Sequence, residues 1–265
     1  MTTPNSAKLP SSVARLLRAA LLGGLCLAGT AARAEVPVNG ANYSDAAVEA
    51  VESLMRVERK SGLPRLSDKV DGKIIEDAWN EAAILGTPPY GANDLQQLLR
   101  IVQRQSRLLQ AYTLYAPNRG KPDIARNAAE YQDEISRSQA FLIKAAAASL
   151  EAIADFMSQL PPDAKTEARL QGVRQMRLGL QEIVSGMALG LRSPALSEAN
   201  QILLAKALSD SAPRIIAGLS PEDRNALVAN LKAAQPALKP AAQKPIADVI
   251  AAAGSAPCED LCAVK

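Results

Sequence analysis

Two cysteines near the C-terminus, Cys258 and Cys262, have a spacing that could do chemistry. Cysteines four residues apart can form a disulfide within a helical turn or a tight loop, and an oxidising compartment favours that outcome. The ring is small and lies beside the terminus, so it adds little chain-entropy stabilisation. Redox-active or partner-linked thiols, and a two-thiolate site for a soft ion such as Cu(I), are the alternatives that this pair leaves open.

Three arginines form a second group of interest. Arg100, Arg104 and Arg107 stand at i, i+4 and i+7, which places them on one face of a helix expected over residues 94–115. In an antiparallel hairpin, carboxylates of the following helix would come level with this face: Glu130, Asp133 and Glu134. The arginines are therefore a solvated face, one side of a set of cross-helix ion pairs, or a surface for acidic lipids or an acidic protein. We take them as the candidate partner-binding face.

Several classes of catalytic and cofactor chemistry are excluded because the chain contains no histidine. This removes Ser-His-Asp and Cys-His catalysis, His-ligated haem and His-containing zinc sites. Nucleophile-elbow, P-loop, Ser-x-x-Lys and Rossmann patterns are also absent. Several carboxylates could form acid–base pairs, but they resemble ordinary exposed helix faces: Glu49, Glu52, Glu76, Asp77 and Glu81. We predict no catalytic residue, no metal and no cofactor. A carboxylate-based enzyme acting on glycans or lipids is the least favoured hypothesis.

The N-terminal segment has the order of a secretory signal peptide. Basic residues come first, residues 19–28 are apolar, and Ala32 and Ala34 supply the small side chains that a signal peptidase requires. The apolar run is shorter than the roughly 20 residues of a membrane span. We therefore expect residues 1–34 to be removed by cleavage after Ala34. The mature protein would then be periplasmic or secreted.

Cleavage would change the electrostatic character of the protein. It removes four of the 30 basic residues and none of the 27 acidic ones, so the net charge becomes −1 instead of +3. The basic isoelectric point of the whole chain therefore does not indicate nucleic-acid binding. The expected partner is a protein of the cell envelope. No transmembrane span is predicted in the mature chain, and peripheral contact with a membrane surface stays open.

A row of glycines lies within the helix expected over residues 163–191. Gly172, Gly179, Gly186 and Gly190 each cost that helix roughly 1 kcal/mol relative to alanine. Close approach of a neighbouring helix would offset this cost, because a stripe without side chains lets two backbones come near. We expect the alanines at 145–148 on the preceding helix to be the partner. A hinge is the alternative explanation.

The order of helix signals predicts an all-α protein. Long helices over 94–115, 122–160 and 163–191, joined by short turns, imply an antiparallel bundle. Shorter helices follow, with Pro213 as an interruption, and the chain ends in a Pro/Ala-rich region. The expected division is an N-terminal helical segment (35–92), a helical bundle (93–234) and a tail with the cysteine pair (235–265).

These features favour a protein that works by contact. The leading hypothesis is an exported, non-catalytic envelope protein acting through protein–protein contacts, as a scaffold or adaptor. The alternative is a thiol-redox or metal-handling periplasmic factor that uses Cys258 and Cys262.

Overall fold

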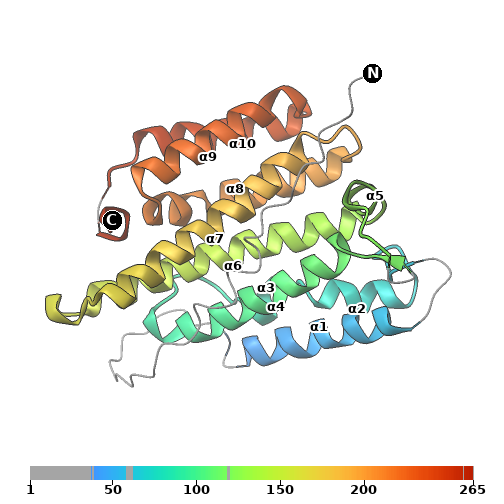
Figure 1. Cartoon of the computed structure of the whole chain (residues 1–265), viewed down its shortest axis with the longest axis horizontal. Helices are drawn as coiled ribbons and strands as arrows, with labels where there is room; N and C mark the ends of the chain where they lie inside the picture. The colour runs from blue at the N-terminus through green and yellow to red at the C-terminus, as the bar shows by residue number, and fades with distance from the viewer. Residues whose placement is uncertain (1–36, 38, 58–61, 118–119, 259, 265) are drawn as a thin grey trace.

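The computed structural model describes residues 37, 39–57, 62–117, 120–258 and 260–264 (Figure 1). These residues form ten α-helices and short 3-10 turns without a β-strand, so the predicted all-α fold is confirmed. The signal-peptide prediction, with Ala32 and Ala34, lies outside the described residues. The helices are α1 (Gly40–Arg56), α2 (Asp71–Asp77), α3 (Glu81–Ile84), α4 (Leu95–Thr113), α5 (Ile124–Glu130), α6 (Gln132–Gln159), α7 (Glu167–Leu191), α8 (Glu198–Gly218), α9 (Pro221–Ala234) and α10 (Pro240–Ser255).

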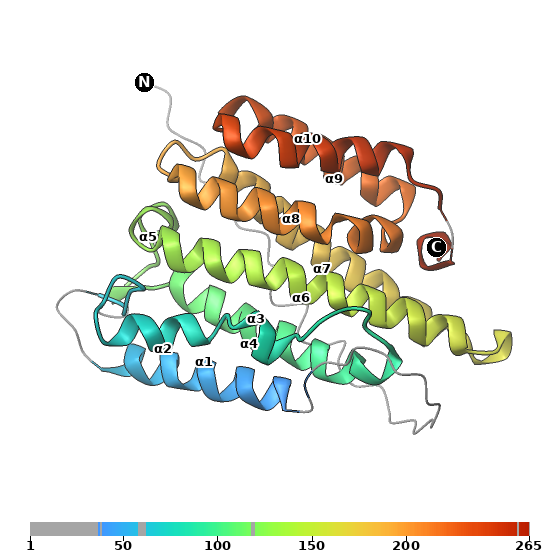
Figure 2. The ribbon, with the colours of Figure 1, turned by 180° about the vertical axis from the view of Figure 1, so that it is seen from behind.

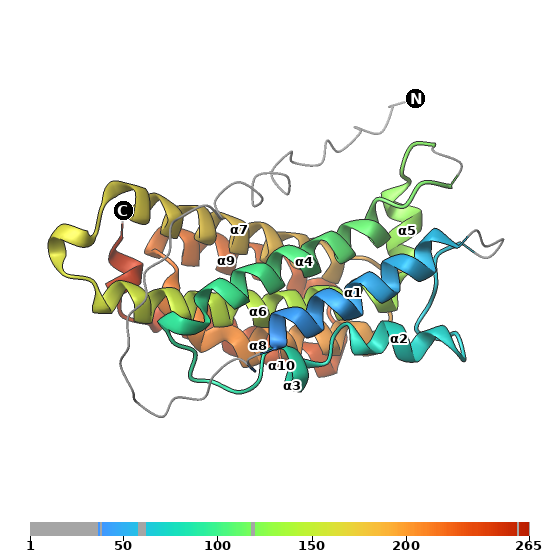
Figure 3. The same ribbon diagram turned by 90° about the horizontal axis from the view of Figure 1, so that it is seen from below.

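Helix α6 runs through the middle of the molecule. Helices α1 to α4 lie on one side of it, and α8, α9 and α10 lie on the other (Figures 1 and 2). Viewed from below, α1 and α4 run side by side (Figure 3). Two hydrophobic cores result, one with α1 to α4 and one with α7 to α10, and α6 contributes buried side chains to both. The two halves of the protein are therefore joined through this helix.

The sequence of α6 explains its central place. A helix that is apolar on most sides must be covered by several neighbours. Phe141 and Leu142 enter the core of α1 to α4, whereas Ile143 and Leu150 enter the other core, and all four are nearly fully buried. Helix α8 comes close here because Gly218 lacks a side chain: a Cβ at this position would lie 3.0 Å from Leu150 Cδ1.

The long helix expected over residues 122–160 is divided in two. Tyr131 leaves the helical conformation between α5 and α6, with φ −112° and ψ 34°. Its hydroxyl accepts a hydrogen bond from the backbone N–H of Leu63 at 3.1 Å, and its ring packs against those of Tyr112 and Tyr115. These are contacts between distant segments, which helical periodicity does not reveal.

Prolines interrupt the C-terminal helices less than expected. Pro213 lies inside α8 and Pro245 lies inside α10, so the predicted break at Pro213 is wrong. A proline within a helix removes one backbone hydrogen bond, here one to the carbonyl of Ser209 and one to that of Ala241. Packing offsets this loss, because Ile215, Ile216 and other apolar residues next to the prolines are buried in the core. The Pro/Ala-rich tail accordingly forms α10, which packs on α8 and α9.

The glycine row of α7 does not form the expected close helix contact. A Cβ added at Gly172, Gly186 or Gly190 would meet no atom within 4 Å, so at these three positions the expectation is corrected. The physical reason is that these three glycines do not face the neighbouring helices. Gly186 is exposed, whereas Val184 and Met187, on the opposite side of the helix, enter the core. Gly179 is buried, but the stripe as a whole is not a packing surface.

Glu134, in the first turn of α6, provides a pH-dependent test of how α6 packs against the segment that contains Leu66. It is 3% exposed, and burial raises the pKa of its carboxyl group above the ordinary value, although the Leu66 backbone N–H donates to it. A raised pKa in the folded state means that stability is lost as the pH rises through that pKa. Between about pH 4 and about pH 7, wild type should therefore lose more unfolding free energy than Glu134→Gln. Urea titrations at both pH values measure the difference, and equal losses would contradict the prediction.

Candidate functional site

Cys258 and Cys262 form a disulfide at the end of the chain, with Cα atoms 5.3 Å apart. Cys258 follows α10 in an extended segment and is exposed. Cys262 lies in the 3-10 turn η6 (Asp260–Ala263) and is only 2% exposed. The cysteine pair predicted from spacing is thus a disulfide, and its two residues differ strongly in access to solvent.

Arg224 holds the segment that leads into Cys258. This residue, in the first turns of α9, is 4% exposed. Its guanidinium donates to the carbonyl of Ala256 at 2.7 Å, to that of Pro257 at 2.9 Å and to that of Ile216 at 2.9 Å. The hydrogen bonds satisfy a buried charge and tie the start of the disulfide loop to the end of α8.

Arg177 holds the other side of the loop in the same way. It lies in α7, is 4% exposed, and donates to the carbonyls of Gly218, Leu261 and Val264. Burial lowers the pKa of its guanidinium below the ordinary value, and the Asp223 carboxylate opposes this shift. Each buried arginine therefore binds the carbonyl that directly precedes one of the two cysteines.

The two arginines were missed as site residues by sequence reasoning. Arg177 falls on the apolar face of α7, three residues before Leu180 and four after Val173, both buried. An arginine at such a position indicates a buried charge that needs hydrogen-bond acceptors, so the helical pattern of the sequence could have identified Arg177 as a buried residue. Nothing in the sequence, however, showed that two of its three acceptors are carbonyl groups more than 80 residues later in the chain.

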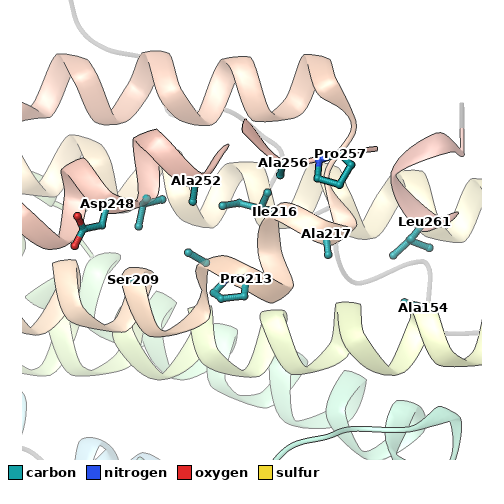
Figure 4. A pocket seen from close by; sticks show the side chains of 12 residues that line it. Ala154, Ser209, Pro213, Ile216, Ala217, Asp248, Ala252, Ala256, Pro257 and Leu261 are labelled. Atoms are coloured by element: carbon teal, nitrogen blue, oxygen red, sulfur yellow. The ribbon is translucent and has the colours of Figure 1, made fainter. Parts of the chain in front are cut away.

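An apolar groove of about 540 Å³ lies between α8 and α10 and ends at the disulfide loop. Its walls are small or aliphatic side chains, and Pro257 and Leu261 of the loop close one end, opposite Asp248 (Figure 4). The volume is within the range of about 300–1,000 Å³ typical of ligand pockets. The residues that line it are Ala154, Ser209, Ala212, Pro213, Ile216, Ala217, Asp248, Val249, Ala252, Ala256, Pro257 and Leu261.

No protein-family model matches this chain, and neither the curated proteins nor the solved structures contain a significant match. Within the described ranges, no helix is both long and apolar enough to cross a membrane. Across the same residues, no three His, Cys, Asp or Glu side chains are grouped so that they could hold a metal ion.

The arginine face of α4 is engaged by α1 instead of α6. Arg100 forms an ion pair with Asp45, and Arg104 pairs with Glu52 at 3.2 Å and lies 3.8 Å from Asp45. Carboxylates of α1 therefore take the place of the acidic residues at 130, 133 and 134 that the antiparallel hairpin suggested. Two of them bind elsewhere, because Glu130 pairs with Arg65 at 2.6 Å and Glu134 accepts from the backbone of Leu66. Arg107 is exposed.

The carboxylates considered as acid–base pairs are not gathered in one place. Glu52 pairs with Arg104, Asp77 with Lys73 and Glu81 with Lys144, while Glu49 and Glu76 are exposed. The pair of Asp77 lies within α2, whereas that of Glu52 joins α1 to α4 and that of Glu81 joins α3 to α6. These are surface ion pairs, and Glu76 lines a polar cavity of about 660 Å³ together with Asp68 and Asp133.

The arginine face should contribute little to stability. Both ion pairs are partly exposed, so Arg100→Gln and Arg104→Gln should each lower the unfolding free energy by less than about 1 kcal/mol. Arg107→Gln, on the exposed end of the same face, is the control and should change it by less than about 0.5 kcal/mol. Urea unfolding in low and high salt measures these values. A loss well above 1 kcal/mol that persists in high salt would contradict the prediction.

Proposed function

We propose that this protein is exported to the cell envelope and acts by contacting a protein partner, as a scaffold or adaptor. One observation supports this proposal most strongly: the half-open apolar groove between α8 and α10. A hollow with almost entirely apolar walls loses water favourably when an apolar partner fills it. The arginine face of α4 is a weaker candidate, because Arg100 and Arg104 already have intramolecular partners.

The occupant we propose is an apolar peptide segment of the partner. Pro213 has no backbone N–H, so the carbonyl of Ser209, a residue of the groove wall, lacks its usual helical donor. The groove lining also contains the polar residues Ser209 and Asp248, to which the backbone N–H groups of a peptide can donate, whereas a hydrocarbon chain has no donor. Small wall residues such as Ala212 and Ala252 leave room for the side chains of such a segment.

A peptide-binding measurement tests the proposal. The probe is a leucine–alanine peptide with lysines at both ends and one central serine, titrated calorimetrically into the purified protein. Ala252→Phe fills the groove and should weaken binding by at least about tenfold, equal to about 1.4 kcal/mol. Ala247→Phe, on the exposed side of α10 and outside the groove, is the matched control and should bind normally. Absence of binding to wild type, or equal loss in both variants, would refute the groove as the contact surface.

A further inference from the structure

The disulfide next to the groove presents only one of its cysteines to a partner. Cys258 is exposed, whereas Cys262 in η6 is only 2% exposed. In thiol–disulfide exchange the attacking thiolate must approach one sulfur along the line of the S–S bond, and the other sulfur leaves. The difference in access selects Cys258 as the attacked sulfur and Cys262 as the leaving group.

Two buried arginines bind the backbone directly before each cysteine of the disulfide. Arg177 binds the carbonyl of Leu261, directly before Cys262, and Arg224 binds that of Pro257, directly before Cys258. Among the described side chains, both guanidinium groups donate to backbone carbonyls, and the nearby Asp223 accepts from Gln181 and Ser220. Positive charge favours a thiolate over a thiol, whereas burial of Cys262 has the opposite effect, so access to solvent, and not charge, decides which sulfur is attacked.

The groove leads to this disulfide. Pro257 and Leu261, each next to a cysteine in sequence, line the groove at the same end (Figure 4). A peptide seated between α8 and α10 would therefore hold its own residues close to Cys258, which raises the effective concentration of any thiol that it carries.

We propose that Cys258 and Cys262 form a reversible disulfide-exchange site that captures a cysteine-bearing apolar peptide segment seated in the α8/α10 groove. This inference rests on the proposed function, in which the peptide binds the α8/α10 groove, and it adds a covalent step. The partner thiolate attacks Sγ of Cys258, a new S–S bond forms, the Cys258–Cys262 bond breaks, and Cys262 leaves as a thiolate. Return attack by Cys262 on Cys258 expels the partner thiolate and restores the disulfide, so no external oxidant is consumed.

Trapping the mixed disulfide tests this site. The oxidised protein is mixed with the leucine–alanine peptide, now with a central cysteine, and quenched with iodoacetamide before mass spectrometry without reducing agent. We expect the peptide on Cys258 and the alkyl group on Cys262. The reverse assignment would overturn the inference. A serine–glutamine peptide with the same ends and the same cysteine is the matched probe, and it should react at least about tenfold more slowly.

The groove variants separate the two proposals. Ala252→Phe should abolish the advantage of the apolar cysteine peptide, and Ala247→Phe should retain it. If the serine peptide binds the groove of wild type but the cysteine peptide forms no adduct, disulfide exchange is refuted and the contact function stands. If both cysteine peptides react at the same rate and the serine peptide does not bind, the groove has no part in capture, and both proposals fail.

Discussion

Replacing Arg177 by methionine should lower the free energy of unfolding by about 3 kcal/mol, because three carbonyl groups lose a charged donor at once and at least one stays buried. Methionine keeps most of the apolar volume, so the change isolates the hydrogen bonds. Urea unfolding followed by far-UV circular dichroism measures the loss. The variant should also lose its disulfide faster to dithiothreitol, because Leu261 and Val264 are no longer held against α7.

A matched control for this variant lies one turn away. Arg174→Met, on the same helix, removes an ion pair with the largely exposed Glu167 and should cost less than about 1 kcal/mol without changing the rate of disulfide reduction. If Arg177→Met were as stable as Arg174→Met and as slow to be reduced, the buried guanidinium would not be the anchor of the C-terminal loop.

The helical class was predictable from sequence because its signals are local. Ser220 followed by Pro221 is such a local start signal, and α9 begins there, with the Ser220 hydroxyl accepting from the Asp223 backbone N–H at 3.2 Å. The apolar character of α6 on most sides is likewise a local signal, which indicates a helix covered by several neighbours. Pro213 was misjudged for the opposite reason: its effect on α8 depends on packing between helices, which exceeds the cost of one lost hydrogen bond.

The candidate site was predictable only in its cysteines. Their spacing gave the disulfide, but the asymmetry between Cys258 and Cys262 depends on how η6 packs against α6 and α8. The glycines of α7 were misread because a stripe defines a helix face and does not say what covers that face. The arginines of α4 were correctly placed on one face, yet periodicity could not distinguish α1 from α6 as the source of their carboxylates.

Leu208→Ala should destabilise both halves of the protein together. Leu208 lies in α8, is fully buried in the core of α7 to α10, and its truncation should cost about 2–5 kcal/mol. Trp79, the single tryptophan, reports on the other core. Because α6 contributes to both cores, the urea midpoint of Trp79 fluorescence should fall by the same amount as the midpoint of circular dichroism.

The exposed residue Ile202, on the same helix, provides the control, since Ile202→Ala removes a side chain that is 36% exposed and should cost less than about 1 kcal/mol. An unchanged Trp79 midpoint in Leu208→Ala would mean that the two cores unfold separately and that α6 does not couple them. Coincident midpoints would make α6 the structural link through which the two cores unfold as one cooperative unit.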